Sequence, residues 1–435
     1  MTFTAILLAL LAPASAQLVE VSPTAGLCDS VKQYSGYYKL TTGDKHYFYW
    51  AFESRSKPST DPVLLWMTGG PGCSSAVALF GENGPCHVNE NGTATMPNAY
   101  SWNQHATVIY IDQPAGTGFS YGVPDAAEKA VANDMYSFLQ AFFQAHPQFQ
   151  ANPFFTFGES FAGHYVPAVT HKIWENNRAL PTGAVKINLQ GVAIGNGLTD
   201  PLTQFKYYAD MAVSTNDHKP AVNNVTHALM KAATGPCIAA IKACQAEPVS
   251  CILAIDTCNI GLLLPYQASG MNPYDMREKC QVPPLCYDFS NVAKFLARPE
   301  VQDAIGVNPH RRWEDCNRGI ALMFELSGDW MQSYQTMIPD QLADGIRVLI
   351  YAGDQDFICN HLGNHAWTNA MVWTHQAEYN STALVEWKVA GKAAGLKQSA
   401  ANFTFLRVYD AGHMVPRDQP EHALEMVNAF LANRL

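Results

Sequence analysis

A buried run that ends in a serine flanked by small residues constrains the fold of this sequence more than any other feature. The apolar segment Phe154–Phe157 is typical of a strand, and it leads directly into residues 158–163, which read GESFAG. Small residues beside the serine permit a strained strand-to-helix turn that exposes its hydroxyl above the end of a sheet. Apolar residues then recur at helical spacing, at Val166, Val169, Ile173 and Trp174. The segment therefore predicts a strand, a tight turn and a helix, with Ser160 as a candidate nucleophile.

An acid and a histidine follow later in the chain, each on a loop after a strand-like run. Asp356 comes after the apolar run 346–352, and His413 comes after the run 403–409. In the α/β-hydrolase fold, the nucleophile, the acid and the histidine follow one another in this order. A histidine held by a buried carboxylate takes the serine proton during attack and returns it to the leaving amine. The order predicts a catalytic relay of Ser160, Asp356 and His413.

Two nearby residues compete for these roles. Asp354 is a rival for the acid because it lies in the same loop as Asp356. His164 is a rival base by proximity to Ser160, but four residues along the expected helix it points back along that helix. We therefore expect His164 to be structural.

Strand-like runs alternate with helical patterns along most of the chain. The clearest helical pattern covers residues 125–146, with Asp125 as a candidate cap, and another covers 421–431. Such alternation predicts an α/β-hydrolase fold, with a mostly parallel central sheet flanked by helices on both faces. The expected strands are 46–52, 63–67, 107–111, 154–157, 187–194, 346–351 and 403–409.

The alternation stops between residues 201 and 287, where four cysteines appear at equal spacing. This segment predicts an inserted helical cap subdomain, with residues 17–200 and 288–435 forming the core. The cysteine spacing is symmetric about residues 247–248, so a helical hairpin turning there would pair Cys244 with Cys251 and Cys237 with Cys258. A zinc site is the alternative, disfavoured because no histidines have matching spacing. We expect two nested disulfides.

The first sixteen residues and the cysteine content predict an oxidising, secretory route. Residues 1–16 read as a signal peptide, with an apolar run and the small-x-small sequence Ala14–Ala16 before the expected cleavage. No later stretch is long and apolar enough to span a bilayer. The eleven cysteines fit this route, and the net charge of −10 argues against nucleic acid as a partner. Glycosylation sequons begin at Asn91, Asn224, Asn380 and Asn402.

A glycine-rich segment follows the expected early strand at 63–67. Residues 66–73 read WMTGGPGC, at the place where this fold takes its second oxyanion donor. Glycines there let backbone N–H groups approach the substrate. We assign the oxyanion hole to the amides of Gly70 and Phe161. A plain glycine-rich turn is the alternative, and a phosphate-binding loop is excluded because the segment lacks the Gly-Lys-Ser/Thr ending.

Together these motifs resemble the serine carboxypeptidase family, to which carboxypeptidase Y and cathepsin A belong. The resemblance covers nearly the whole mature chain. The matching segments are 69–75, 112–114, 116–121, 158–163, 195–200, 353–359 and 412–416. It implies a metal-independent hydrolase without a cofactor that removes residues from peptide or protein C-termini through an acyl-enzyme in a mildly acidic lumen.

The resemblance also implies a site for the free carboxylate of the substrate. Glu82 and Glu159 are expected to lie close enough to share a proton, so that one of them donates to the carboxylate. Gly69, Thr68 and Trp66 belong to the same site by resemblance. The family usually has asparagine where this chain has Thr68, so carboxylate recognition is expected to be weaker or rearranged.

By position, a further set of residues resembles the lining of the pocket for the penultimate residue, which implies a preference for apolar side chains. The set is Phe161, Leu198, Phe205, Tyr208, Leu263, Trp330, Ile358 and Cys359, and Met414 is expected to touch the departing residue. For the remaining cysteines, the resemblance implies that Cys73 pairs with Cys316 and Cys280 with Cys286, that Cys359 stays free, and that Cys28 and Cys86 are left for each other.

Two other functions and several destinations remain open. The same scaffold serves acyltransferases, which use a hydroxyl acceptor in place of water, and a non-catalytic stabilising or binding role is a third reading. A homodimer is one assembly that the resemblance leaves open. The lysosome or vacuole and the cell exterior are the expected destinations.

Overall fold

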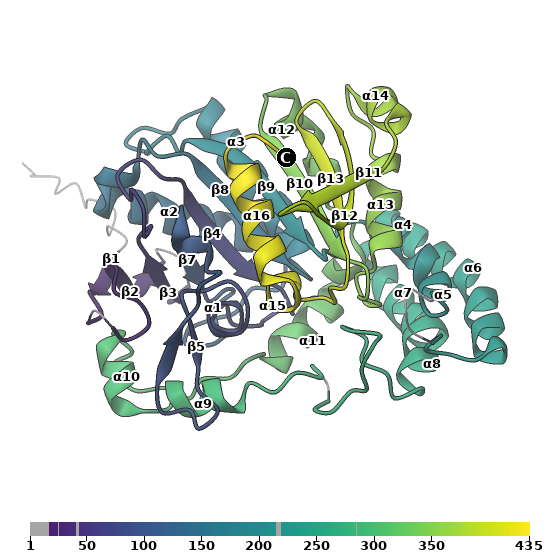
Figure 1. The fold of residues 1–435 in the computed structure, drawn as a ribbon, viewed down its shortest axis with the longest axis horizontal. Helices are drawn as coiled ribbons and strands as arrows, with labels where there is room; N and C mark the ends of the chain where they lie inside the picture. The colour runs from purple at the N-terminus through teal and green to yellow at the C-terminus, as the bar shows by residue number, and fades with distance from the viewer. Residues whose placement is uncertain (1–16, 25, 41–42, 215–218, 284) are drawn as a thin grey trace, which may run out of the picture.

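A single large sheet forms the centre of the computed structural model, which describes residues 17–435 except 25, 41–42, 215–218 and 284. The expected signal peptide, residues 1–16, lies outside the described residues. The sheet has eleven strands in the order β1-β2-β3-β7-β4-β8-β9-β10-β13-β12-β11 (Figure 1). Its six central strands are parallel neighbours: β7 (Thr107–Ile111), β4 (Val63–Thr68), β8 (Phe154–Glu159), β9 (Leu189–Gly195), β10 (Arg347–Gly353) and β13 (Phe403–Val408).

Antiparallel strands extend this parallel centre on both sides. One side adds β3 (His46–Phe52), β2 (Gln33–Lys39) and β1 (Gln17–Val21), and the other adds β12 (Lys392–Ala400) and β11 (Val385–Val389). The edge strand β11 has a register shift between Trp387 and Lys388, and an ion pair joins Glu386 to Lys388 at 2.9 Å. A separate two-stranded sheet pairs β5 (Cys86–Val88) with β6 (Thr95–Pro97).

Helices cover both faces of the sheet and bury its apolar strands between two cores. The helices α2 (Glu128–Ala145) and α3 (Ala162–Arg178) bury Phe138, Phe142 and Val166 in one core. The helix α16 (Pro420–Leu431) buries Met426 and Phe430 in the other, and Figure 1 shows it crossing the opposite face. The central strands are buried on both faces because their residues are mostly apolar, β-branched or aromatic. This is the predicted α/β-hydrolase arrangement.

The helix expected over 125–146 begins later than its sequence pattern indicates. The helix α2 starts at Glu128, and Asp125 does not cap it because its carboxylate is an ion-pair partner of Lys45. Lys45 is nearly buried, and leaving its ammonium without a carboxylate partner would cost more free energy than losing a helix cap. The backbone N–H of Glu128 instead donates to Asp329 Oδ2 at 3.0 Å, a residue far away in the sequence.

Between the adjacent strands β9 and β10 the chain is helical, as expected for an insertion. The first helices are α4 (Pro201–Gln204), α5 (Tyr208–Met211), α6 (Asn224–Ala246), α7 (Cys251–Cys258) and α8 (Leu264–Gln267), which form the right-hand side of Figure 1. Disulfides Cys237–Cys258 and Cys244–Cys251 join α6 to α7, so these cysteines are not zinc ligands. The boundaries 201 and 287 stay a prediction.

The remaining helices and disulfides tie the loops to the sheet. The other helices are α1 (Ala76–Gly81), α9 (Ser290–Leu296), α10 (Pro299–Ala304), α11 (Arg318–Ser327), α12 (Pro339–Ala343), α13 (His361–Ala370), α14 (Gln376–Ser381) and α15 (Val415–Asp418). Three further disulfides are Cys28–Cys86, Cys73–Cys316 and Cys280–Cys286, and Cys359 is a buried free thiol. None of the helices in the described ranges has the length and apolarity needed to cross a bilayer.

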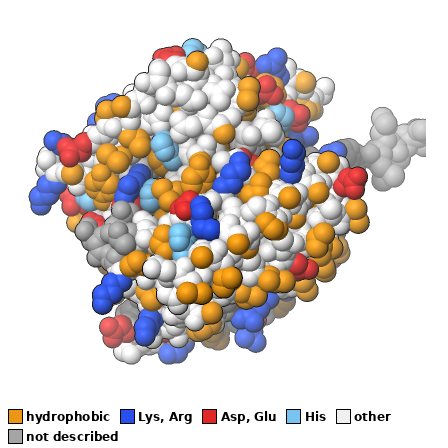
Figure 2. All heavy atoms as spheres, turned by 90° about the vertical axis from the view of Figure 1, so that its right-hand side faces the viewer, with side chains coloured by type: hydrophobic (Ala, Val, Ile, Leu, Met, Phe, Trp, Pro, Cys, Tyr) orange, Lys and Arg blue, Asp and Glu red, His pale blue; other side chains and the backbone are white. Residues whose placement is uncertain are grey.

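The face formed by the insertion helices has a mixed surface. Figure 2 shows hydrophobic side chains there, interspersed with charged and polar ones of both signs. Several large apolar side chains of these helices are exposed, including Leu229, Leu253 and Ile260. The mixture gives this face no single-sign electrostatic field.

Candidate active site

The turn at Ser160 is strained in the way its flanking residues predict. Ser160 has a φ of 66°, and its N–H lies 3.1 Å from the carbonyl oxygens of both Gly195 and Asn196. A Cβ at Gly158 would lie 2.6 Å from Ala162 Cβ, and a Cβ at Gly163 would lie 2.4 Å from a backbone oxygen. Only glycine fits at positions 158 and 163, so the turn is tight, α3 begins at Ala162 and the serine stands at the carboxyl end of β8.

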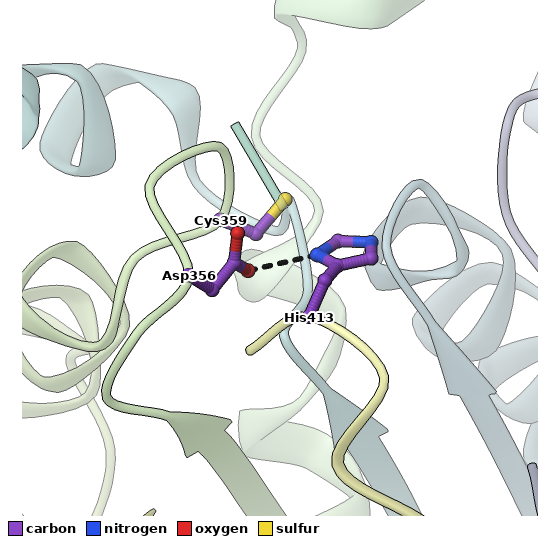
Figure 3. Close-up of side chains that lie close together, drawn as sticks. All are labelled: Asp356, Cys359 and His413. Carbon is purple, nitrogen blue, oxygen red and sulfur yellow. Dashed lines mark hydrogen bonds and ion pairs between the residues drawn. The ribbon is translucent and has the colours of Figure 1, made fainter. Parts of the chain in front are cut away.

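The acid and the histidine meet at the carboxyl ends of β10 and β13. His413 Nδ1 lies 2.8 Å from Asp356 Oδ2, and Figure 3 shows this pair with the Cys359 sulfur beside it. The Asp356 carboxylate is fully buried and also accepts from Asn196 Nδ2 at 2.8 Å and from the Ile358 N–H at 3.0 Å. These donors orient the carboxylate, which fixes the imidazole tautomer that leaves Nε2 free to accept a proton.

The two rival residues are engaged elsewhere. Asp354 accepts from Arg407 Nη2 at 2.9 Å and from the Asp410 N–H at 3.0 Å. His164 is buried, its Nδ1 lies 2.6 Å from the Leu198 carbonyl oxygen, and burial lowers its pKa to about 4. The structure therefore pairs His413 with Asp356 and keeps His164 neutral within the core.

The glycine-rich loop runs directly against the Ser160 turn. A Cβ at Gly69 would lie only 2.4 Å from the Phe161 nitrogen, so backbone and turn are in contact there. Gly70 has a φ of 111°, a conformation that side chains rarely tolerate. Within the described chain, the N–H groups of Gly70 and Phe161 donate to no other group. The two amides assigned to the oxyanion hole are thus free to donate.

Two carboxyl groups are buried next to the nucleophile. Glu159 is the last residue of β8, Glu82 follows α1, and each is 2% exposed. Burial raises the pKa of Glu82 to about 7. Burial, and then the charge of Glu82, raise the pKa of Glu159 well above its usual range. Because both cannot ionise cheaply at short range, the pair retains a proton into the neutral range.

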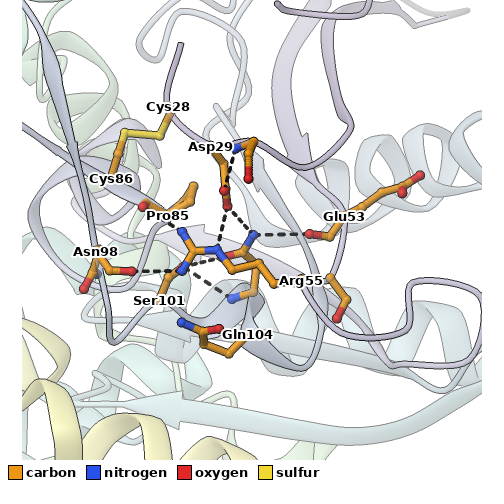
Figure 4. Close-up of polar contacts among 12 residues, drawn as sticks. Cys28, Asp29, Glu53, Arg55, Pro85, Cys86, Asn98, Ser101 and Gln104 are labelled. Carbon is orange, nitrogen blue, oxygen red and sulfur yellow. Dashed lines mark hydrogen bonds and ion pairs between the residues drawn. A yellow bond between two sulfur atoms is a disulfide. The ribbon is translucent and has the colours of Figure 1, made fainter. Parts of the chain in front are cut away.

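Figure 4 shows a network around Arg55 that includes Pro85, three residues after Glu82. The Arg55 guanidinium donates to Asp29 Oδ2 at 2.9 Å, to the Asn98 carbonyl at 2.9 Å and to the Pro85 carbonyl at 3.1 Å. Asn98 Nδ2 in turn donates to the Gly84 carbonyl at 2.9 Å. No sequence motif indicates this role, because the partners of Arg55 are mostly backbone carbonyls of distant loops.

Thr68 lies beside Glu159 at the ends of adjacent strands. The register of β4 and β8 places the two residues opposite each other. Thr68 Oγ1 accepts from Trp66 Nε1 at 2.9 Å, while the Thr68 N–H donates to Ser75 Oγ at 3.2 Å. The Thr68 hydroxyl makes no donation to any residue in the described ranges, so its proton is available to a ligand.

One cavity of about 350 Å³ brings most of the predicted groups together, although Glu82, Trp66 and Phe161 are not part of its lining. Its lining includes Ser160, His413, Glu159 and Thr68, as well as Gly69 and Gly70. Tyr274 and Tyr287 add aromatic walls that the sequence did not indicate, and the Tyr274 carbonyl accepts from the His413 N–H at 2.8 Å.

Of the residues expected in the pocket for the penultimate side chain, Trp330 lines this cavity. Met414, which was expected to touch the departing residue, lines it as well. The Phe161 ring lies 5.1 Å from the Trp330 ring, centroid to centroid, just behind it. The others are not part of its lining, and they pack in or against the hydrophobic core: Leu198, Phe205, Tyr208, Leu263, Ile358 and Cys359. Their role in specificity stays a prediction.

Comparisons with known proteins identify relatives of this chain. The serine carboxypeptidase family profile matches residues 23–433. Carboxypeptidase Y of Komagataella phaffii is 44% identical over 409 residues, which cover 93% of this chain and 76% of that protein. Carboxypeptidase Y homolog A of Arthroderma otae is 43% identical over 416 residues, covering 93% and 75%.

A solved structure shows the same fold at lower sequence identity. Kex1Δp, a prohormone-processing carboxypeptidase from Saccharomyces cerevisiae, aligns with a TM-score of 0.82 over 95% of this chain and 94% of its own, at 24% identity. With the family profile and the relatives above, it leads to one conclusion: this chain belongs to the serine carboxypeptidase family.

Proposed function

We propose that this carboxypeptidase uses Ser160, His413 and Asp356 to release C-terminal residues through an acyl-enzyme, and that it works best at acidic pH. The observation that carries the proposal is the buried pair of carboxyl groups, Glu82 and Glu159, next to the nucleophile. A pair that retains a proton presents an O–H donor to a negatively charged group, which two ionised carboxylates would repel.

The relay supplies the covalent chemistry. Ser160 Oγ attacks the carbonyl carbon of the last peptide bond while His413 Nε2 takes the hydroxyl proton, and Asp356 stabilises the imidazolium. The Gly70 and Phe161 amides donate to the developing oxyanion. His413 then protonates the leaving amine, and the terminal residue departs. Water activated by the same imidazole hydrolyses the acyl ester and restores the serine.

Recognition of the terminal carboxylate gives the pH dependence. The carboxylate accepts the proton shared by Glu82 and Glu159 and a hydrogen bond from the Thr68 hydroxyl, beside the Gly69 backbone and Trp66. As the pH rises and the pair loses its shared proton, the two ionised carboxylates repel the substrate carboxylate and binding weakens. The aromatic and aliphatic walls of the cavity, including Tyr274 and Met414, support a preference for apolar side chains.

The proposed setting is the secretory pathway, with the lysosome, the vacuole or the cell exterior as destination. The disulfides support it, because such bonds persist in oxidising compartments. Asn91, Asn224 and Asn380 are exposed, although the Asn380 amide donates to the Asn369 carbonyl at 3.1 Å. Asn402 is only half-exposed, and its amide donates to the Leu342 and Ile346 carbonyls, so it is the least accessible of the four sequons.

The test compares an N-blocked dipeptide of two apolar residues with its C-terminal amide, from acidic to neutral pH. We expect residue release that favours the free acid, that falls as the pH rises, and that disappears in Ser160→Ala. Thr68 favours one alternative, an acyltransferase, because it departs from the family's asparagine. Two intact peptides together with transfer of an acyl ester to an alcohol would establish that alternative instead.

A further inference from the structure

A second cleft, separate from the active-site cavity, is lined by several lysine, arginine and histidine side chains. It has a volume of about 540 Å³ and lies between α13, β13 and the short helix η3 (Phe205–Tyr207). Lys206, His361, His365 and Arg407 contribute to its lining. Among its described lining residues there is no aspartate or glutamate, and none of them lines the active-site cavity.

Two buried nitrogen atoms in this cleft have no hydrogen-bond partner among the described residues. His361 is 5% exposed, and its Nδ1 is unpaired. Arg407 Nε is also buried and unpaired, although Arg407 Nη2 donates to Asp354 at 2.9 Å. Buried polar groups in folded proteins nearly always have partners, so these two nitrogen atoms have unused hydrogen-bonding capacity at the wall of the cleft.

The geometry points to a binding site for a tetrahedral oxyanion, a sulfate or phosphate group, held by His361, Arg407 and Lys206. The guanidinium N–H groups suit oxyanion geometry, and the exposed ammonium of Lys206 stands on the facing helix η3. Asp354 forms an ion pair with Arg407, but it is not among the residues that line the cleft.

The charges around His361 also predict how binding depends on pH. Burial, followed by the charges of Arg407 and His365, lowers the pKa of His361 to about 3, so the imidazole is neutral in the empty cleft. Lys206 from η3 adds a further positive charge, Tyr207 adds a neutral phenol, and Asp354 faces the cluster only through Arg407. A bound dianion offsets these positive charges and favours protonation of His361, so binding is coupled to proton uptake.

Titration calorimetry with sodium sulfate tests the site on the full chain at constant ionic strength. Sulfate stays a dianion across the range, so any change of affinity reports on the protein. We expect saturable binding of one sulfate, about tenfold tighter at about pH 5 than at about pH 7. We also expect binding heats that depend on the ionisation enthalpy of the buffer, as proton uptake requires. No saturable heat at either pH would overturn the proposal.

Two variants locate the ligand. Lys206→Ala removes an exposed charge and is expected to weaken sulfate binding about tenfold, while His361→Gln keeps an N–H donor but abolishes the dependence on pH. Lys242→Ala is the matched control, an exposed lysine on α6 outside the cleft, with thermal unfolding confirming that each variant folds. Equal weakening in Lys242→Ala, or no change in either cleft variant, would refute the assignment.

The source of the group is tested separately. Leu362, Leu384 and Phe405 give the cleft apolar surface beside its nitrogen atoms. Comparing inorganic phosphate with phenyl phosphate therefore distinguishes a free anion from a phosphate attached to an organic body. Tighter binding of phenyl phosphate assigns the cleft to an ester, and equal binding assigns it to the free anion.

Discussion

Asn196 is the residue that most directly orients the acid of the relay. Its Nδ2 donates to Asp356 Oδ2 at 2.8 Å, and its Oδ1 accepts from the Gly353 N–H at 3.1 Å. It also occupies a left-handed conformation, with a φ of 41°. The side chain therefore connects the end of β9 to the loop after β10, and it acts on catalysis through Asp356.

Asn196→Ala is expected to lower kcat/KM about 10- to 100-fold, because a hydrogen bond to a buried charge is lost. The loss should fall mainly on kcat, since substrate contacts remain. Steady-state kinetics with an N-blocked dipeptide measures it, and Asn188→Ala, a half-exposed asparagine before β9 and outside the active-site cavity, is the control. A loss confined to KM would contradict a role in positioning Asp356.

Thr68→Val is expected to raise KM for the free-acid peptide about tenfold, because a donor to a charged group is removed. Hydrolysis of a C-terminally blocked ester should change little, since it offers no carboxylate. Thr68→Ser keeps the hydroxyl and should restore most of the binding. If both variants behave alike toward both substrates, Thr68 acts only through packing.

For single residues, the sequence predicted those that belong to motifs following one another in a known order along the chain. Ser160, Asp356 and His413 follow from chain order, and Glu82 with Glu159 followed from resemblance alone. Asn196 and Arg55 were missed as positioning residues because their partners come from distant loops. Only the fold reveals that Gly353, Asp356 and Asn196 converge, or that Arg55 reaches the carbonyls near Glu82.

At the scale of elements, the nested bridges make α6 and α7 one unit. Cys237–Cys258 closes a span of 21 residues and Cys244–Cys251 a span of 7. Their regular spacing made both pairs predictable, because the two cysteines of each pair lie equally far from the turn at residues 247–248.

Removing the outer bridge is expected to cost more stability than removing the inner one. The loop-entropy relation gives about 3 kcal/mol for the longer span and about 2 kcal/mol for the shorter. Alanine pairs at 237/258 and at 244/251, compared by chemical denaturation, measure the difference. A larger loss from the inner pair would mean that local packing, rather than loop closure, dominates.

In the large sheet the sequence predicted β3 but missed the other antiparallel strands at the sides, which are β1, β2, β11 and β12. β12 is rich in alanine and lysine, which have low strand propensity, and Gly36 interrupts the tyrosine-rich run of β2. Pairing with β3 and β13 stabilises them as strands. The central strands were predicted to within about two residues because burial on both faces requires continuous apolar runs.

At the scale of the whole molecule, buried carboxyl groups make the stability of the fold depend on pH. Their pKa values are raised, chiefly by burial, to about 7 for Glu82, to about 6 for Asp112, Asp329 and Asp418, and well above the usual range for Glu128. Such a group binds its proton more tightly in the folded chain, so its stabilisation is complete at low pH and is lost as the pH rises through the folded pKa.

Two buried histidines, His164 and His361, act in the opposite direction, because their pKa values are lowered to about 4 and about 3. They become protonated in the unfolded chain below about pH 6.5 and favour unfolding there. The carboxyl groups outnumber these two histidines. We therefore expect the unfolding temperature to decrease as the pH rises from about 5 to about 7.

Thermal unfolding of Glu128→Gln tests the cause. Both Glu128 oxygens are buried without a partner in the described structure, beside Asp329, so a neutral amide should reduce the pH dependence and stabilise the chain at neutral pH. Glu300→Gln, an exposed control, should change neither. If the unfolding temperature of Glu128→Gln changes with pH as steeply as that of the unsubstituted protein, other groups cause the pH dependence.

The edge strand β11 also governs how copies of this protein meet. Its bulge at Trp387 and Lys388, and the charged pair Glu386 and Lys388, interrupt the flat row of backbone groups that another strand would need. A neighbouring molecule cannot extend the sheet there by simple strand addition, which protects a concentrated preparation from fibre-like growth.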